Sequence, residues 1–406
     1  QIATNVSSFY YDREIAGMFF ITADVVAGVD PAIVEQSMDE VMEAFIKKGP
    51  STKLLKAEKT KAIAGFIRGI QRIGGFGGKS DLLATCQTYT GNPGCYQESA
   101  KYLDAATSSK IKATFAEWID DTPYVLTILP SDQYGLSDES VDRSTGVPYP
   151  TEKVSFKFPT LQTATLSNGA KVVLAQRSDV PLVEMNFQFN FGYAQENNDE
   201  LGFTNFMMDM LNEGTRKYSS LEFDQILDSL GSNIGFGSGL DSSFVSISSL
   251  KDNLDETLDL AKEAVMYPTF PLDEIERIKK QTLAAFKREE FRPASIAFRN
   301  IGNLLYGQDH PYGKLLIGSG VSETITSLTQ SDLSSIHKRT LNPMNLTFVV
   351  AGDISLDEIT EKLEKKFGSW NADISYPLKE LSTVALPEKR IVYLIDKPNA
   401  QQSYIV

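Results

Sequence analysis

The chain has few of the residues that most often carry metal-dependent or nucleophilic chemistry. Its 406 residues include two His, two Cys and two Trp. The histidines, His310 and His337, lie 27 positions apart. No convincing Ser/His/Asp set can be assembled, because every Ser would need one of these two as its base. We expect both histidines to be structural or surface residues rather than catalytic or metal-binding ones.

Long apolar runs and an excess of positive charge are also missing. No apolar stretch approaches the length that crosses a bilayer, so we expect no membrane span. No charged and apolar leader follows Gln1, so a signal peptide is absent or already removed. The formal net charge is −14, whereas nucleic acids and anionic membrane surfaces reward clustered Lys and Arg. We therefore exclude both as main partners.

The two cysteines, Cys86 and Cys95, are separated by a turn-rich segment that ends in Gly-Asn-Pro-Gly. Such a turn could bring the thiols together, and a disulfide would fit an oxidising compartment. Spacing alone does not decide between a disulfide and two free thiols. A structural zinc site needs about four nitrogen or sulfur ligands, and no Cys-x-x-Cys pair is present to begin one.

The first third of the chain alternates short β-rich runs with long helical ones. Asp30 can cap a helix whose first residue is Pro31, a favoured pairing at a helix start. Residues 131–158 are rich in Ser, Asp, Gly and Pro and have no periodicity, which is typical of a linker. The pattern predicts these elements: a strand within 17–28, helices over 30–49, 52–73 and 111–119, and a closing strand over 123–130.

After the linker a similar order of strands and helices begins again. Asn168-Gly169 predicts a hairpin turn, and later segments predict strands over 182–195 and 243–250, a helix over 201–215 and a strand and capped helix over 342–370. The order strand, acidic helix, Pro break and basic helix occurs in both halves, with Pro50 and Pro271 as the matching breaks. This weak internal repeat predicts a duplicated domain of the α+β class.

Residues 74–80, Gly-Gly-Phe-Gly-Gly-Lys-Ser, superficially resemble a phosphate-binding loop. That motif needs Gly, four residues and Gly-Lys-Ser between a strand and a helix. The position five before Gly78 is Ile73, and the preceding segment is predicted to be helical. We interpret the segment as a flexible break between helices.

The segment 201–215 has the spacing of an amphipathic helix closed by Gly-Thr. Asn205 and Asp209 lie one turn apart on one face, with Met208 beside them. Were these His, His and Glu, two imidazoles could hold Zn²⁺ and the carboxylate could act as base. Asn is a poor zinc ligand, Met accepts no proton, and one carboxylate falls short of three ligands. The helix is predicted to pack in the core without doing chemistry. Five apolar side chains at helical spacing should face the core: Phe203, Phe206, Met207, Met210 and Leu211.

Residues 159–406 as a whole resemble the insulinase/pitrilysin family of zinc peptidases, the inverzincins. The segments that carry the resemblance are 166–174, 191–215, 266–270, 304–318 and 341–355. Active members hold His-x-x-Glu-His in a frame that this chain matches at Gly202, Met210, Gly214 and Thr215.

In that frame Asn205, Met208 and Asp209 fall on the His, Glu and His. The third family ligand, a Glu on a later helix, falls on Ala285. The resemblance therefore implies a degenerate copy in which all four chemical positions are replaced. It implies no catalytic or metal-binding residue and no zinc in this chain, with zinc expected in an upstream active copy.

The resemblance also implies a fold and a domain plan. The fold is α+β, with repeated domains of the insulinase/mitochondrial-processing-peptidase type (LuxS/MPP-like metallohydrolase), each a mixed, largely antiparallel sheet flanked by long helices. Residues 1–135 would be the truncated second domain of the preceding active copy, and 136–158 a linker. Residues 159–385 would form the first domain of the inactive copy, and 386–406 a truncated start of a further domain.

The function implied is that of the non-catalytic half of a zinc-dependent metalloendopeptidase. This half would enclose and bind peptide substrate, while the missing active half, in the same chain or a partner subunit, would cut it. Bacterial relatives built from four such domains are commonly exported to the periplasm, so the resemblance implies a periplasmic or exported location. The alternative is a non-enzymatic scaffold or assembly subunit of the same fold.

Overall fold

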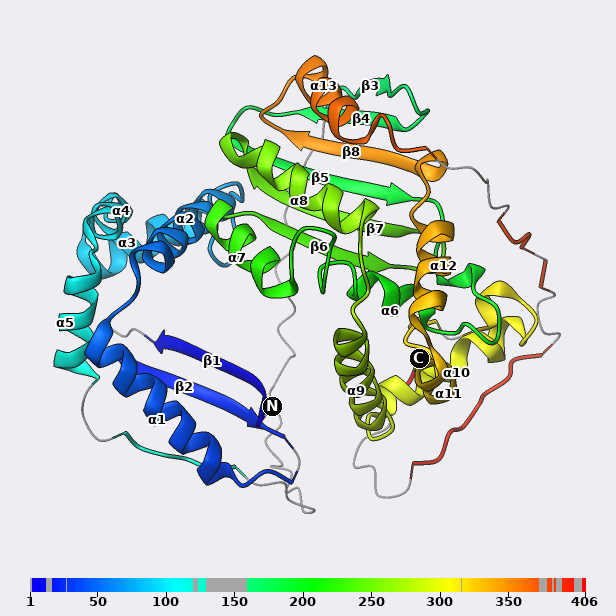
Figure 1. Cartoon of the computed structure of the whole chain (residues 1–406), viewed down its shortest axis with the longest axis horizontal. Helices are drawn as coiled ribbons and strands as arrows, with labels where there is room; N and C mark the ends of the chain where they lie inside the picture. The colour runs from blue at the N-terminus through cyan, green and yellow to red at the C-terminus, as the bar shows by residue number, and fades with distance from the viewer. Residues whose placement is uncertain are drawn as a thin grey trace. The chain divides into compact units, whose positions relative to one another are not determined.

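The chain, seen in a computed structural model, divides into two compact units (Figure 1). Unit 1 comprises Gln1–Lys59 and Gly74–Phe158, and unit 2 comprises Thr60–Ile73 and Pro159–Val406. The predicted linker lies outside the described residues. The structure describes residues 2–11, 17–26, 28–119, 123–128, 159–314, 316–371, 378–381, 383–384, 389–397 and 404–406.

Unit 1 is built from one antiparallel strand pair and several helices. Its elements are β1 (Ala3–Tyr11), β2 (Met18–Val25), α1 (Pro31–Lys48), the first part of α2 (Thr52–Gly69), α3 (Lys79–Thr90), α4 (Tyr96–Ala105) and α5 (Ser108–Trp118). Asp30 caps α1 by accepting a hydrogen bond from the Ala32 amide at 3.0 Å, as predicted. Helix α2 ends at Gly69, four residues before the predicted end.

A disulfide joins Cys86 in α3 to Cys95 at the start of α4, with their Cα atoms 5.4 Å apart. This settles the alternative that spacing left open. Among the described residues of unit 1, only Val34 and Cys86 are buried hydrophobic side chains. Because so small a core supplies little hydrophobic stabilisation, the covalent bond carries more weight here than it would in a larger domain.

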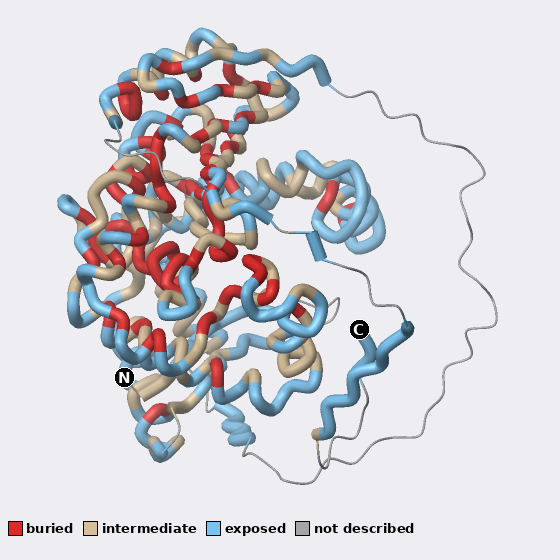
Figure 2. Tube along the Cα trace, turned by 90° about the vertical axis from the view of Figure 1, so that its right-hand side faces the viewer, coloured by how far each residue is buried: buried red, intermediate tan, exposed pale blue. Residues whose placement is uncertain are grey.

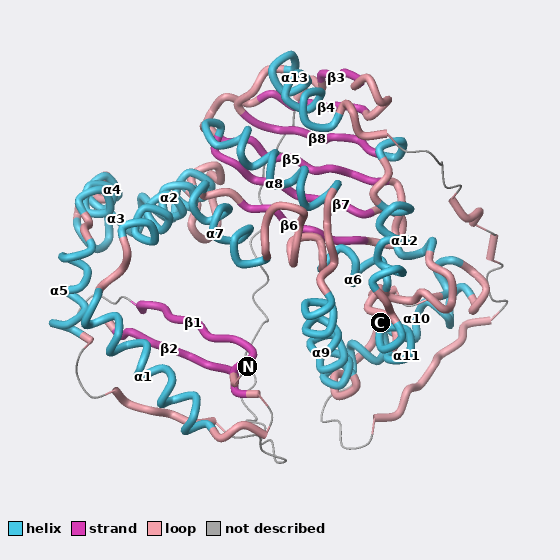
Figure 3. Tube along the Cα trace, viewed as in Figure 1, coloured by secondary structure: helices cyan, strands magenta, loops and turns pink. Residues whose placement is uncertain are grey.

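Unit 2 is organised around one six-stranded mixed sheet (Figure 3). The strand order is β3-β4-β8-β5-β7-β6, and every neighbouring pair is antiparallel except β4 with β8. This confirms the predicted α+β class with a largely antiparallel sheet. The strands are β3 (Gln162–Thr165), β4 (Lys171–Gln176), β5 (Leu182–Phe189), β6 (Asn233–Ser238), β7 (Ser243–Leu250) and β8 (Leu346–Gly352).

Helices α8 and α13 lie across one face of this sheet (Figure 1), where α8 contacts β7 and α13 contacts β3 and β4. The helical elements of unit 2 are the rest of α2, η1 (Tyr193–Gln195), α6 (Phe203–Asp209), α7 (Ser220–Leu230), η2 (Lys251–Asn253), α8 (Leu254–Met266), α9 (Leu272–Glu289), α10 (Pro293–Tyr306), η3 (Pro311–Gly313), α11 (Ser322–Ser327), α12 (Gln330–Thr340), η4 (Pro343–Asn345) and α13 (Leu356–Phe367). Within the described ranges, none of the chain's helices combines the length and apolarity that crossing a bilayer requires.

The hydrophobic core of the described chain belongs to unit 2 (Figure 2). Alternate residues of the central strand β5 point into it, and Phe187 packs edge-on against Phe348 and Phe367 at centroid distances of 4.7 and 5.2 Å. The hairpin predicted at Asn168-Gly169 is present between β3 and β4. The Asn168 amide fastens it by donating to the Phe367 carbonyl at 3.0 Å.

The strand predicted over 123–130 is wrong in its described part, and residues 389–397, whose composition is also typical of a strand, do not form one. Residues 123–128 and 389–397 have irregular backbone, and most of their large apolar side chains are exposed. Both segments have the composition of strands, but β-propensity measures how well a side chain packs against neighbouring strands. In the part of the chain that the structure describes, neither segment pairs with a strand, so composition alone does not produce one.

Candidate functional site

Helix α6, the helix of interest, is shorter than the sequence predicts. It covers Phe203–Asp209, whereas the apolar spacing predicted 201–215. After the helix the backbone leaves helical hydrogen bonding and forms isolated bridges, Gly214 with Ser219 and Thr215 with Pro268. These tertiary pairings end the helix earlier than periodicity suggests.

Helix α6 lies against the edge strand β6 and also contacts α12 and η1 (Figure 3). The five apolar residues predicted to face the core are all buried, each with no more than 6% of its surface exposed. The remaining positions of α6, on which the resemblance would place the family's metal site, therefore lie on a helix that packs against the core and against the edge strand.

Asn205 and Met208 have purely structural surroundings. The Asn205 side-chain amide donates to the Gly318 carbonyl at 2.9 Å. Met208 is completely buried and belongs to the hydrophobic core. An amide committed to a backbone carbonyl and a thioether inside the core leave no room for a metal ligand or a general base at these two positions.

Asp209 is the one carboxylate of the set. Its side chain is exposed at the end of α6, yet enough protein surrounds the carboxylate that desolvation, followed by the charge of Glu213, raises its pKa to about 6. Glu213 in turn forms an ion pair with Arg277 of α9. Asp209 is thus beside a carboxylate that forms an ion pair with an arginine, and not beside a group of other metal ligands in the described part of the chain.

Ala285 lies on α9, two turns beyond Arg277, and is half-buried. Its methyl group has no atom that binds a metal. The four positions thus present one amide, one thioether, one carboxylate and one methyl group. This donor set does not fit a zinc ion, which takes three protein ligands in catalytic sites and four in structural ones. The described residues contain no group of three or more His, Cys, Asp or Glu that could hold a metal.

A tight glycine contact fixes the start of α6. Gly202 has φ of +91° and lies directly against Gly320, which has φ of +85°. Arg299 secures the opposing segment by donating to the Ser319 hydroxyl at 3.0 Å and to the Gly320 carbonyl at 2.9 Å. Together with the hydrogen bond from Asn205 to the Gly318 carbonyl, these contacts hold the segment 318–320 tightly against the start of α6.

Sequence reasoning missed the buried carboxylate beside this contact, Glu196. One oxygen accepts from the Gly202 amide at 2.8 Å and the other from the Thr204 amide at 2.6 Å. Burial raises its pKa to about 7, although the two amide hydrogen bonds and Lys314 oppose the rise. An acidic residue shortly before a helix is a weak signal for such amide capping, and it could have marked this residue.

Glu196 predicts a pH dependence of stability. Its folded pKa of about 7 exceeds the ordinary 4.5, so the group favours folding most at low pH, and this contribution is lost as pH rises toward 7. We expect the contribution of Glu196 to the free energy of unfolding to fall by about 2–3 kcal/mol between pH 4.5 and 8. Urea unfolding can be followed by the fluorescence of Trp370, which packs on Phe189 in unit 2, in a Trp118→Phe background.

The matched control for this effect is Glu196→Gln, which keeps the shape but does not titrate. The raised pKa of Asp209 also makes the free energy of unfolding fall as pH rises. The contribution of Glu196 is therefore the difference in this pH dependence between the parent and Glu196→Gln. As pH rises, the free energy of unfolding should fall less in the variant than in the parent. Parallel pH profiles for parent and variant would contradict the assignment.

The two histidines have structural surroundings. The His310 ring stacks on Tyr306 at 5.0 Å, and its Nδ1 accepts from the Tyr312 amide at 3.0 Å. His337 Nε2 lies 2.8 Å from the Val265 carbonyl, and burial lowers the pKa of its ring. The structure brings neither ring into a metal cluster among the described residues.

The glycine-rich segment 74–80 lacks the surroundings of a phosphate loop. Helix α2 precedes it, and residues 70–78, all of them described, contain no strand. The Asp81 carboxylate accepts from the Gly77 amide at 2.9 Å. A carboxylate therefore already occupies a position at which a phosphate would need free amide groups.

Comparison with known proteins places most of unit 2 in one family. The insulinase family (peptidase family M16) matches residues 171–318, and the peptidase M16 inactive domain matches residues 327–406. An uncharacterised zinc protease from Rickettsia felis is 24% identical over 204 residues, covering 50% of this chain and 49% of its own. The non-peptidase homolog YmxG of Helicobacter pylori is 22% identical over 242 residues, covering 58% of this chain and 55% of its own.

Solved structures give the same result. The peptidase M16 inactive domain of Pseudomonas fluorescens superposes with a TM-score of 0.52 at 26% identity, over 55% of this chain and 54% of that one. The first half of the periplasmic protease PqqL of Escherichia coli shares the fold, with a TM-score of 0.51 at 19% identity over 56% and 51% of the two chains. The chain spans about half the length of the curated relatives it matches. With matches to both family domains and to solved members, the chain belongs to the insulinase family, peptidase family M16.

Proposed function

We propose that this chain supplies the non-catalytic half of an insulinase-family zinc metalloendopeptidase, the half that encloses and binds peptide. The observation that supports this proposal is the surroundings of two side chains of α6, Asn205 and Met208. The Asn205 side chain forms a hydrogen bond with the Gly318 carbonyl, and Met208 is buried in the core. These two side chains therefore stabilise the fold and do not supply catalytic groups. In this proposal residues 1–135 belong to the preceding copy and residues 159–385 to the degenerate one.

Peptide binding is supported by the position of β6. It is an edge strand of the sheet, and α6 lies against it. An extended peptide can add to such an edge through backbone hydrogen bonds, and it would then pass beside the positions that carry catalytic groups in active members. The net charge of −14 would weakly favour basic peptides.

An exported, periplasmic location is supported by two observations. The disulfide between Cys86 and Cys95 fits an oxidising compartment. The structurally similar protein PqqL is described as periplasmic. We propose the same compartment for the protein that contains this chain.

Metal analysis tests the proposal. The purified 406-residue chain should hold no stoichiometric zinc and should not hydrolyse peptides, because its donor set does not fit the ion. The full-length protein should hold about one zinc per chain and show chelator-sensitive peptide hydrolysis. Stoichiometric zinc in the short chain, abolished by Asp209→Asn and accompanied by chelator-sensitive hydrolysis, would overturn the assignment of an inactive copy.

The scaffold alternative keeps one specific support, the relationship to the non-peptidase homolog YmxG. It predicts a full-length protein that holds no zinc and has a second degenerate copy in place of an active one. Intact His-x-x-Glu-His in the sequence upstream of Gln1, with zinc bound, would exclude it.

A further inference from the structure

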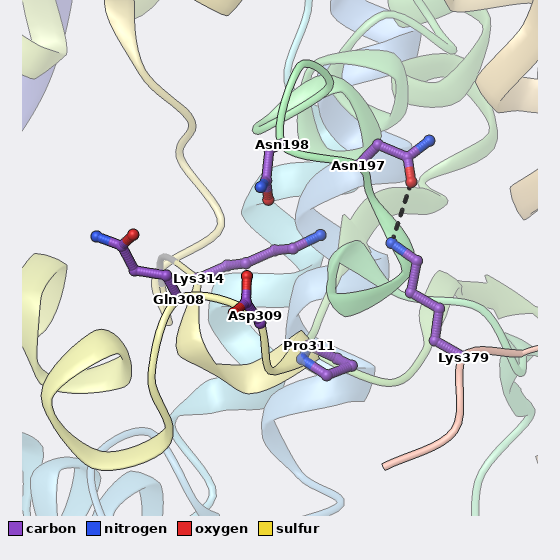
Figure 4. Close-up of a pocket in the computed structure, with 7 residues that line it drawn as sticks. All are labelled: Asn197, Asn198, Gln308, Asp309, Pro311, Lys314 and Lys379. Atoms are coloured by element: carbon purple, nitrogen blue, oxygen red, sulfur yellow. Dashed lines mark hydrogen bonds between the residues drawn. The ribbon is translucent and has the colours of Figure 1, made fainter. Parts of the chain in front are cut away.

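Beside Glu196 lies a polar pocket that the proposed function does not use. Its volume is about 250 Å³. It lies within unit 2, between the segment after η1, the connection from α10 to η3, and the short segment around residue 379 (Figure 4). The lining residues are Asn197, Asn198, Gln308, Asp309, Pro311, Lys314 and Lys379.

Two ammonium groups converge at one side of this pocket. Figure 4 shows the amines of Lys314 and Lys379 pointing toward one another. Both donate to the backbone carbonyl of Glu196, Lys379 at 2.6 Å, and Lys379 also donates to the Asn197 side-chain oxygen at 3.2 Å. Desolvation, followed by the charge of Lys379, lowers the pKa of Lys314 to about 8.

The nearby carboxylates Glu196 and Glu200 favour the charged form of Lys314, but neither forms an ion pair with Lys314 or Lys379. Glu196 directs both carboxylate oxygens to backbone amides, and Glu200 forms an ion pair with Arg339 at 2.6 Å. Within the described ranges of the chain, neither lysine forms an ion pair with a carboxylate. Two ammonium groups close together repel each other when no counterion lies between them. A single negative charge bound at this side of the pocket would offset that repulsion.

We propose that this pocket binds a compact monoanion of the carboxylate class, held between the ammonium groups of Lys314 and Lys379. The lining carries two positive charges and the single negative charge of Asp309, so its net charge matches one negative charge better than two. The side-chain amides of Asn198 and Gln308 can donate to the second carboxylate oxygen. The pocket has this chemistry whether or not the chain belongs to a peptidase.

Titration calorimetry on the whole chain, with defined probes, tests this inference. The probes are propionate, N-acetyl-trialanine with a free carboxylate, the same peptide with a terminal amide, and inorganic phosphate. We expect the carboxylate probes to bind at least about 10-fold more tightly than the amide and phosphate probes. A preference for propionate identifies a free small molecule as the source, and a preference for the peptide identifies a chain terminus.

Substitutions locate the binding. Lys314→Met and Lys379→Met should each weaken carboxylate binding by about 10-fold or more, and Lys314→Arg should retain most of it. Lys280→Met, on the exposed face of α9, is the matched control and should leave binding unchanged. Circular dichroism of each variant confirms that it is folded.

Binding should also weaken as pH rises from about 6.5 to 9. Over this range Lys314 loses its charge and Glu196 gains one. The other charged groups around the pocket are Lys379, Glu200 and Asp309. Equal binding of the free acid and the amide, tighter binding of phosphate, or full binding by both lysine variants would each overturn the inference.

Discussion

Met208→Glu should destabilise unit 2 severely instead of restoring a catalytic base. Met208 has no exposed surface and lies within the main hydrophobic core. A carboxylate placed in this apolar core loses its hydration, so either the charge is buried or the group takes up a proton. Together with the lost packing of the thioether, we expect a loss of about 4–6 kcal/mol at pH 7.

Urea unfolding followed by Trp370 fluorescence, in the Trp118→Phe background, measures this loss. Met208→Leu is the matched control and should cost less than about 1.5 kcal/mol, because it conserves volume. Burial raises the folded pKa of the new carboxyl, so the loss of stability should shrink as pH falls through that raised pKa toward the ordinary pKa of a Glu side chain and should level off below it. A stable, soluble Met208→Glu protein with a pH-independent stability would show that the position is open to solvent or to a charged partner.

The fold of unit 2 follows closely from local patterns. The alternation of 182–195 predicts the central strand β5, the five apolar positions of the segment 203–211 are buried as predicted, and the break at Pro271 separates two helices in the structure. These signals succeed because each reflects burial against one continuous core. They fail at the end of α6, where bridges to residues 219 and 268 replace helical hydrogen bonds.

The candidate site was only partly predictable. Asn205, Met208 and Asp209 could be placed on one helix, because residues one turn apart share a face. The hydrogen bond of Asn205 to Gly318 spans 113 positions, and Lys379 reaches Glu196 across 183. Periodicity has no information over such separations, so the glycine contact and the lysine pocket could be found only once the chain was folded.

Gly202→Ala is the second substitution from which we expect a large effect. The added methyl carbon would lie 2.6 Å from the Gly320 Cα and 2.9 Å from the Ser319 carbonyl oxygen. Backbone at φ of +91° is in addition unfavourable for Ala. The neighbouring atoms are backbone and cannot rotate away, so we expect unit 2 to lose about 3–5 kcal/mol.

Gly169→Ala separates the steric contact from the backbone conformation. Gly169 has φ of +90°, and a methyl carbon added there would meet no atom within 4 Å. It should therefore lose only the backbone preference, about 1–2 kcal/mol by urea unfolding. The excess in Gly202→Ala then measures how tightly the segment 318–320 is clamped to α6. Equal losses at the two glycines would mean that this segment moves aside freely and is not held tightly against the start of α6.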